Sequence, residues 1–390
     1  MFRPILFLRA FGLAWSLLVC PLALLLLVSC VTVQGAVFGV GSLLLGIAPS
    51  LVLIGARRHP RLRRAGWICF VCWLLVALGL AIVSPNGRSR SDARVRNCYV
   101  GGSEAYQRLA LGALLPEVDQ FMLGFKLVTV VDSLFTAKQA SSLSVLTKKI
   151  YADLESDADF HALGSVMPDA YDELWGRKFD RGHYFLYVPP RLDRRRPAPA
   201  LVFLHGSGGN FKAYTWLLSR VADECGMVLI CPSYGMGNWE SPGGIQAVAA
   251  ALGDAGKSLP LDLNQVHLAG LSNGGLGVSR VAASDFGKRF RSLIFLSAVC
   301  DGAAIATSNF ADQWRDKPVL IITGAADDRV PLRYVSGYAS RMRNSGARIE
   351  MNTYESADHF LFFSHRDRCL EQLSSWLKQH SDSPPLSSRD

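Results

Sequence analysis

The residues with the clearest chemical potential lie in the hexapeptide G-L-S-N-G-G at residues 270–275. A serine hydroxyl is a weak nucleophile, and it needs a neighbouring base and an exposed position to attack a substrate. A run of β character precedes the hexapeptide and a helical run follows it, so Ser272 is predicted to lie at a sharp strand-to-helix turn. The flanking glycines let the strand and helix backbones approach where a Cβ atom would collide. Because a glycine-rich chain contains such a pattern by chance fairly often, its value depends on the rest of the sequence.

A second glycine-rich turn, H-G-S-G-G-N at residues 205–210, follows an apolar run typical of a strand buried on both faces. Acyl transfer passes through a tetrahedral intermediate, and backbone N–H groups of such a turn can donate hydrogen bonds to its oxyanion. The alternative is an ordinary strand-to-helix loop. His205 itself is expected to be structural.

An acid and an imidazole follow two later strands. The turn after residue 323 carries Asp327 and Asp328, and the turn after residue 354 carries His359. A serine, then an acid, then a histidine is the chain order of the triad in sheets whose nucleophile lies on such a strand-to-helix turn. The four turns therefore form one ordered set.

The sequence that contains these four ordered turns resembles the α/β-hydrolase superfamily. It is most similar to esterases of the dienelactone-hydrolase, carboxylesterase and polyester-depolymerase kind. The resemblance covers about half of the chain, residues 183–380. It implies that Ser272 is the nucleophile and that His359 is the general base and then the general acid. It also implies an oxyanion hole formed by the backbone N–H groups of Ser207 and Asn273.

The acid role has two candidates. Asp327 lies three residues after Gly324 and three before Val330, as in the family pattern, so we assign it to orient and stabilise the imidazolium. Asp328 is expected to make a local structural contact. The histidine departs from the family pattern, because it lacks the usual preceding Gly-x-Gly and follows Asp358.

The resemblance implies a serine hydrolase that cleaves carboxylic esters through an acyl-enzyme, with no metal and no cofactor. A serine peptidase or an acyltransferase with the same triad is an alternative, and so is an inactive binding protein on a hydrolase fold. A complete ordered triad argues against the inactive protein. The expected partners are a small-molecule or lipid-like ester and a lipid bilayer, and the sequence identifies no protein partner.

The elements that must position these turns alternate between β and helical character from residue 183 onward. This alternation predicts an α/β fold with a mostly parallel sheet flanked by helices. Strands are expected at 184–188, 200–204, 227–231, 265–269, 293–298, 319–323 and 348–354, and helices at 212–224, 245–255, 275–283, 334–344 and 367–379.

The N-terminal region has the composition of membrane-spanning helices. Runs without a charged side chain cover residues 11–33, 36–56 and 66–83. About 20 apolar residues cross the hydrocarbon layer, so residues 1–83 are predicted to form a membrane region with three transmembrane helices. Three buried helices of a soluble domain are the alternative, which long uncharged runs in close succession disfavour.

The net charge of +9 belongs to the same region. Residues 1–100 hold 11 basic residues and one acidic residue, whereas the rest of the chain holds 30 basic and 31 acidic residues. A basic nucleic-acid-binding face on the C-terminal domain is therefore not expected.

The arginines predict the topology. Seven of them lie at the N-terminus and in the loop between the second and third runs, and four follow the third run, which places the N-terminus inside the cell. The catalytic domain after residue 83 is then extracytoplasmic, either periplasmic or extracellular. Residues 27–30 resemble a bacterial lipoprotein cleavage box, so a signal peptide with lipidation at Cys30 competes with the first span. The catalytic domain is outside in both cases.

Residues 84–180 are the least regular part of the chain. A linker is expected at 86–91, and a helical extension or cap of the catalytic domain follows it, with one helix starting near Ser103 and another near Pro116. A lid or an interfacial helix that leans on the bilayer is the alternative for the second helix. The catalytic domain is predicted at 181–380 and a polar tail at 381–390.

Overall fold

The computed structural model describes residues 3–85, 87, 92–101, 103–104, 111–165, 167 and 182–381. The chain divides into two compact units. Unit 1 contains residues 1–86 and 107–152, and unit 2 contains residues 87–106 and 153–390. Apart from Gly87 and Ser381, the predicted linker and polar tail lie outside the described residues. The boundaries at 84 and 181 stay predictions.

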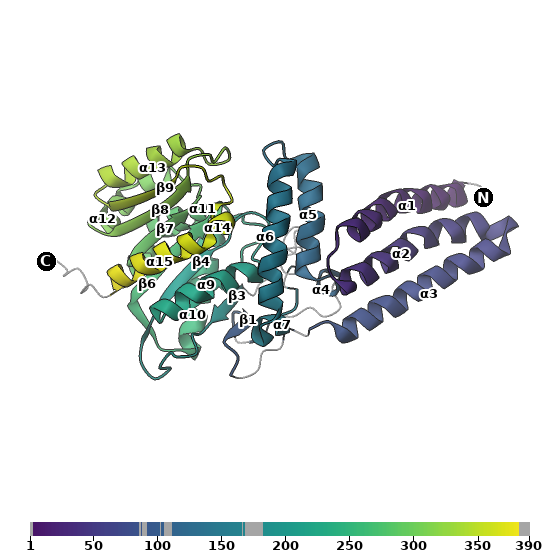
Figure 1. The fold of residues 1–390 in the computed structure, drawn as a ribbon, viewed down its shortest axis with the longest axis horizontal. Coiled ribbons are helices and arrows are strands. Elements are labelled where there is room, and N and C mark those ends of the chain that lie inside the picture. The colour runs from purple at the N-terminus through teal and green to yellow at the C-terminus, as the bar shows by residue number, and fades with distance from the viewer. Residues whose placement is uncertain are drawn as a thin grey trace. The chain divides into compact units, whose positions relative to one another are not determined.

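Unit 1 contains three helices that are long and apolar enough to cross a membrane. They are α1 (Arg3–Ser29), α2 (Val33–Arg58) and α3 (Pro60–Val83), which extend side by side in Figure 1. Their apolar stretches are 22 to 24 residues long with a mean hydropathy of 2.3 to 2.5. The three predicted apolar helices are therefore present.

Small and polar residues join α1 to α2. A Cβ atom added at Gly46 would lie 2.7 Å from Cys20 Sγ, so the absence of a side chain permits this close approach. Ser16 Oγ donates to the carbonyl of Gly46 at 2.6 Å and lies 2.7 Å from Ser50 Oγ. These hydrogen bonds give the hydroxyls partners within an apolar surface.

The rest of unit 1 is a helical hairpin. The short helix α4 (Leu111–Leu114) precedes α5 (Glu117–Val131), and α6 (Ala137–Glu155) returns beside α5. The two helices pack through aromatic rings, with centroids 5.8 Å apart for Phe121 and Tyr151. The helix expected near Pro116 is therefore present, whereas the described residues Ser103–Glu104 form a strand.

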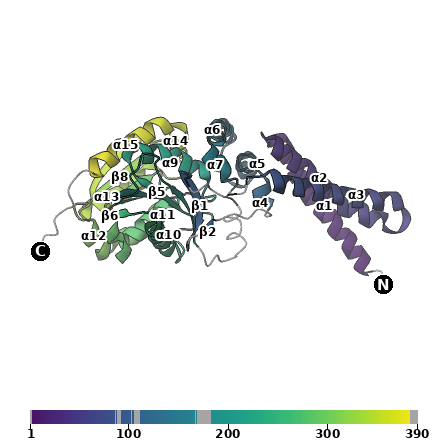
Figure 2. The same cartoon turned by 90° about the horizontal axis from the view of Figure 1, so that it is seen from below.

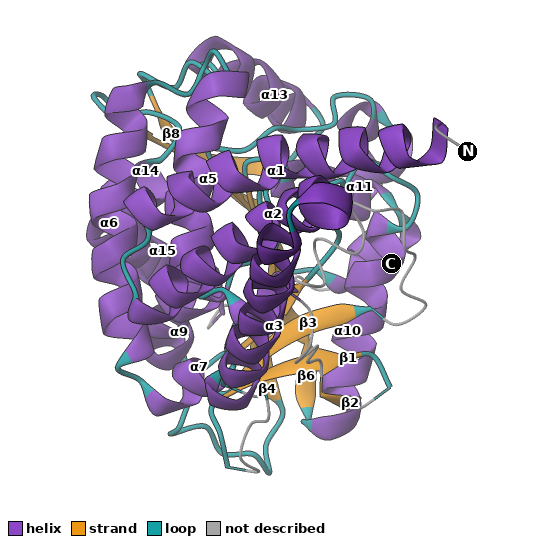
Figure 3. Ribbon diagram, turned by 90° about the vertical axis from the view of Figure 1, so that its right-hand side faces the viewer, coloured by secondary structure: helices purple, strands orange, loops and turns teal. Residues whose placement is uncertain are grey.

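Unit 2 is built on a nine-stranded sheet, shown in orange in Figure 3, with the order β2-β1-β3-β5-β4-β6-β7-β8-β9. Strands β4 to β9 run parallel to one another, and β3 is antiparallel to both of its neighbours. The strands are β1 (Val95–Tyr99), β2 (Ser103–Glu104), β3 (His183–Tyr187), β4 (Ala198–Leu204), β5 (Val228–Pro232), β6 (Leu261–Leu271), β7 (Ser292–Leu296), β8 (Pro318–Gly324) and β9 (Arg348–Tyr354).

Helices cover both faces of this sheet, as Figure 2 shows. α9 (Lys212–Cys225) and α15 (Arg366–Ser381) lie on one face, and α10 (Gly244–Ser258), α11 (Gly274–Ala283) and α12 (Ser308–Trp314) lie on the other. The central strands are buried on both sides, which explains their continuous apolar sequences. The remaining helices of unit 2 are α7 (Ala158–Ala162), α13 (Leu332–Asn344) and α14 (Leu361–Ser364).

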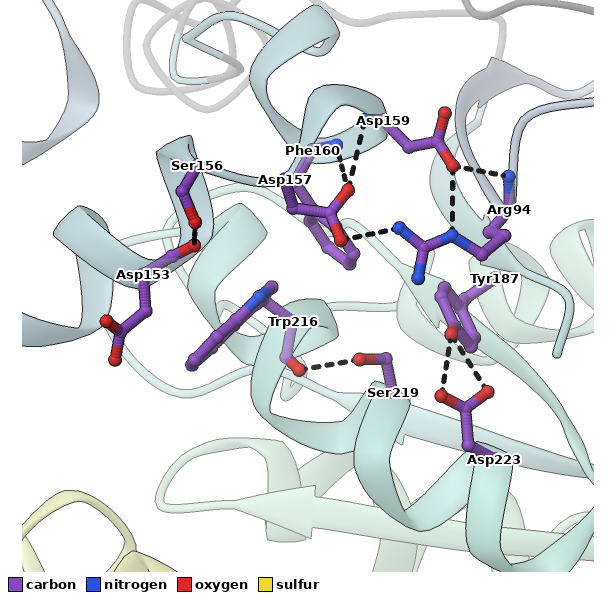
Figure 4. Close-up of polar contacts among 10 residues, drawn as sticks. All are labelled: Arg94, Asp153, Ser156, Asp157, Asp159, Phe160, Tyr187, Trp216, Ser219 and Asp223. Atoms are coloured by element: carbon purple, nitrogen blue, oxygen red, sulfur yellow. Dashed lines mark hydrogen bonds and ion pairs between the residues drawn. The ribbon is translucent and has the colours of Figure 1, made fainter. Parts of the chain in front are cut away.

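The sheet begins earlier in the chain than the sequence indicates. β1 pairs with β3 along its whole length, from Val95 opposite Tyr187 to Tyr99 opposite His183. Helices α4 to α7 are thus inserted between two adjacent strands of one sheet. Arg94, just before β1, donates from Nε to Asp159 Oδ2 at 3.0 Å and also pairs with Asp157, both at the start of α7 (Figure 4). These ion pairs hold α7 against β1.

Candidate active site

Ser272 occupies the turn between β6 and α11. Its φ is 50°, in the left-handed region that a side chain rarely adopts, at a cost of about 1–3 kcal/mol. The neighbouring strand stabilises this backbone, because Ser272 N donates to the carbonyl of Leu296 at 3.0 Å. Gly275 N donates back to the carbonyl of Ser272 at 3.0 Å and closes the turn. Ser272 therefore has the strained, outward-pointing geometry of a nucleophile elbow.

The glycines around Ser272 are required by contact distances. A Cβ atom at Gly270 would lie 2.5 Å from the carbonyl carbon of Gly274, and one at Gly274 would lie 2.1 Å from the carbonyl oxygen of Leu204. Both contacts are with backbone, which cannot move aside without displacing β4 or α11. This is the physical reason for the G-x-S-x-G spacing.

The structure brings the three candidate triad residues into one hydrogen-bonded chain. Ser272 Oγ lies 2.9 Å from His359 Nε2, and His359 Nδ1 lies 2.8 Å from Asp327 Oδ2. The Asp327 side chain is fully buried and the His359 side chain is 11% exposed, so the pair is shielded while the imidazole still meets the solvent edge. This geometry lets the imidazole accept the serine proton and places a carboxylate against the resulting cation.

The turn after β8 separates the two aspartates. Asp327 Oδ1 accepts hydrogen bonds from the backbone N–H groups of Arg329 and Val330, at 2.9 and 2.8 Å, which leaves Oδ2 for His359. Asp328 is exposed at the surface of the same turn. Of the two candidates, only Asp327 bonds to His359 among the described contacts.

The turn after β9 packs directly on the acid turn. A Cβ atom at Gly324 would lie 2.1 Å from the carbonyl oxygen of Ala357, and Ala326 N donates to that same oxygen at 3.0 Å. Asp358 Oδ1 accepts from Phe360 N at 3.0 Å, which closes a local turn around the histidine. The sequence did not reveal these positioning roles of Gly324 and Asp358.

The glycine-rich turn after β4 lies against the elbow. A Cβ atom at Gly206 would lie 3.2 Å from Ser272 Cβ. Ser207 is exposed and Asn273 is half-buried, and neither of their backbone N–H groups donates to another protein group among the described hydrogen bonds. Both amides are therefore available to a group bound next to Ser272.

His205 fixes this turn from the inside. Its Nδ1–H donates to the carbonyl of Gly206 at 2.8 Å, and its Nε2 accepts from Tyr234 N at 3.1 Å. Trp239 Nε1 donates to the His205 carbonyl at 2.8 Å. Complete burial lowers the pKa of His205 to about 4, so the ring is neutral near pH 7 and can serve as both donor and acceptor. The expected structural role of His205 fits these contacts.

His267 is a second buried histidine, located inside β6. Its Nδ1 lies 2.6 Å from Ser292 Oγ, and burial, followed by the charge of Arg291, lowers its pKa to about 3. Among the described residues, no group of three or more histidine, cysteine or acidic side chains could hold a metal ion. The nine cysteines all lie among the described residues, and no disulfide joins them there.

Comparison with family models gives one match. Residues 303–384 match the model of the prolyl oligopeptidase family, a stretch that contains Asp327 and His359 but not Ser272. No curated protein matches the sequence significantly.

Solved structures similar to the chain include several esterases. A ferulic acid esterase is 17% identical, with a TM-score of 0.44 over 52% of this chain and 93% of its own. A thermophilic esterase from the planctomycete Thermogutta terrifontis is 18% identical, with a TM-score of 0.44 over 53% of this chain and 92% of its own. A thermostable esterase from Pseudomonas putida is 18% identical, with a TM-score of 0.44 over 53% of this chain and 81% of its own.

The fold assignment rests on the molecule itself. The sheet begins with the antiparallel strands β2, β1 and β3 and has a crossed order at β5 and β4, and the nucleophile, acid and histidine turns follow β6, β8 and β9. The predicted fold is confirmed. Unit 2 has the α/β-hydrolase fold with the site architecture of a serine hydrolase.

Proposed function

We propose that the chain is a membrane-anchored serine hydrolase that cleaves carboxylic esters through an acyl-enzyme intermediate. The observation that carries this proposal is the continuous hydrogen-bonded chain from Ser272 through His359 to Asp327 on a strained elbow. Its substrate is a small-molecule or lipid-like ester.

The proposed reaction follows from the positions of the atoms. His359 Nε2 accepts the proton of Ser272 Oγ as that oxygen attacks the ester carbonyl carbon, and Asp327 stabilises the imidazolium. The backbone N–H groups of Ser207 and Asn273 donate to the oxyanion. The imidazolium then protonates the leaving alcohol oxygen. Water, deprotonated by His359, then attacks the acyl carbon, and the imidazolium returns this proton to Ser272 Oγ as the bond from Oγ to the acyl carbon breaks and the carboxylic acid leaves.

A peptidase is the second candidate, because the matched family model is named for prolyl oligopeptidases. The match covers the acid and histidine turns. These turns serve ester and amide cleavage alike, since both reactions pass through a tetrahedral intermediate. An acyltransferase differs only in that another alcohol or amine replaces water in the second step.

A substrate screen tests the ester proposal. We expect the full-length protein in detergent to hydrolyse p-nitrophenyl esters of graded acyl length, and Ser272→Ala to abolish this turnover. Ser284→Ala, which removes a hydroxyl at the far end of α11, is the matched control and should keep it. Turnover confined to proline-containing peptide p-nitroanilides would favour the peptidase. Ester turnover that survives in Ser272→Ala would contradict the proposed nucleophile.

We also propose that α1 to α3 cross the membrane and that the catalytic unit faces the periplasm or the cell exterior. The seven arginines on one side support this orientation, against four that follow the third helix. Of those four, Arg88 and Arg90 lie outside the described residues. An alkaline phosphatase reporter fused after residue 390 should be active. Activity of a cytoplasm-only reporter at that site would overturn the orientation.

A further inference from the structure

The hairpin of unit 1 has an apolar face that its own packing does not use. Val118 and Met122 of α5 are buried, at 5% and 3% exposure, and Phe121 beside them contacts Tyr151 of α6. Farther along the helix, Val130 and Val131 are 83% and 81% exposed. Leu127, which shares a helix face with Val131 at a spacing of four residues, is also exposed. We call these three residues the outer face of α5.

The start of α5 is tied to the ends of the apolar helices. Asp119, fully buried, accepts from Val31 N at 2.6 Å and also from the hydroxyl of Thr32, the residue that caps α2. Gln34 Nε2 donates to the carbonyl of Leu114 at 2.9 Å and to Ser84 Oγ at 2.9 Å. These hydrogen bonds place the start of α5 at the level where α1 ends, α2 begins and α3 ends.

The helix α5 changes the direction of the chain at the ends of the apolar helices. In Figures 1 and 2, α5 lies between α6 and α1 to α3, and Figure 1 shows it running across their direction. The face of α5 that points away from α6 is therefore on the side of α1 to α3. The outer face belongs to the second half of this helix, beyond the hydrogen bonds that join its start to the spans.

We propose that the outer face of α5 lies in the interfacial layer of the bilayer that α1 to α3 cross. A helix in this layer buries its apolar side chains about 5–10 Å into the boundary between headgroups and acyl chains. Continuity with the apolar helices favours the bilayer over a protein partner. The exposed Lys126 directly precedes Leu127 in the chain, where its ammonium group can reach lipid phosphates. The hairpin then fixes α5 flat on the membrane surface.

Site-specific photocrosslinking tests this placement. A diazirine amino acid replaces Val131 in the full-length protein, which is reconstituted in vesicles of phosphatidylcholine and phosphatidylglycerol and irradiated. Val145, an apolar side chain on α6 that is 67% exposed, is the matched control on the helix farther from the spans. We expect mass spectrometry to find lipid adducts at position 131 at least tenfold above those at position 145.

A second labelled position tests whether the result at position 131 is specific to that one variant. The same amino acid at Leu127 should also give lipid adducts, and circular dichroism should show unchanged helix content in all three variants. Folded proteins that give only water or protein adducts at positions 127 and 131 would overturn the proposal. Equal lipid labelling at positions 131 and 145 would overturn it too, because the outer face would then have no special position.

Discussion

The two units bury their apolar side chains in opposite ways. In unit 2, Leu293 on β7 and Phe203 on β4 are fully buried. In unit 1, Leu17 and Phe7 on α1 are 68% and 72% exposed. A water-exposed leucine is unfavourable by about 1.5–3 kcal/mol relative to a buried one. The many exposed apolar side chains of α1 therefore require another apolar environment. This difference supports the proposal that the helices of the first unit lie in lipid, whereas the second unit has the buried core of a water-exposed domain.

The units also differ in what their polar groups do. In unit 1, Ser16 and Asp119 join helices to each other and to turns. In unit 2, the polar groups of Asp327, His359 and Ser272 form a directed chain that ends at the surface. The chain in unit 2 ends in a half-buried serine that can meet a substrate, whereas the contacts in unit 1 join helices and turns to one another.

The largest expected effect separates the two neighbouring aspartates. Asp327→Asn should lower kcat for ester hydrolysis by about 10⁴, because a neutral amide cannot stabilise the imidazolium. Asp328→Asn should keep most activity, because its carboxylate is exposed. Steady-state kinetics on both variants checks this. The reverse result would assign the acid role to Asp328.

Two leucine substitutions sharpen the comparison of the units. Leu293→Ala removes a fully buried side chain and should destabilise unit 2 by about 2–5 kcal/mol. Leu17→Ala removes an exposed side chain, so it should change the stability of unit 1 by less than about 1 kcal/mol when the protein is in lipid. Urea denaturation of the full-length protein in lipid nanodiscs measures both. Equal losses would mean that Leu17 lies in a packed interface.

A smaller effect concerns acid stability. Burial lowers the pKa values of His205 and His267 in the folded state to about 4 and about 3, from an ordinary value of 6.5. Their contribution to stability is therefore complete above pH 6.5 and is lost as the pH falls toward these values. Each group should contribute a slope of about 1.4 kcal/mol per pH unit in this window.

The variant His267→Gln isolates one of these slopes. Its free energy of unfolding, measured between pH 6 and pH 5, should fall less steeply than that of the unchanged protein, by about 1.4 kcal/mol per pH unit. His365→Gln, at the boundary of α14 and α15, is the control. An unchanged slope in His267→Gln would show that this ring is protonated in the folded protein.

The sequence was informative where local patterns decide the structure. The apolar strands of unit 2, the elbow at Ser272 and the long apolar helices follow from composition and spacing. β1 was missed, because Val95–Tyr99 alternates with polar residues beside a basic segment and pairs with a strand far along the chain. Such long-range pairing leaves no local signal. The contact of Gly324 with Ala357 likewise depends on two turns that only the folded sheet brings together.

A covalent probe tests the central claim most directly. The full-length protein is treated with a fluorophosphonate, digested and analysed by mass spectrometry. The account predicts one adduct on the peptide that contains Ser272, lost in Ser272→Ala and strongly slowed in His359→Ala, because the imidazole activates the hydroxyl. Stoichiometric labelling of a folded Ser272→Ala variant, or an adduct located on another serine, would contradict it.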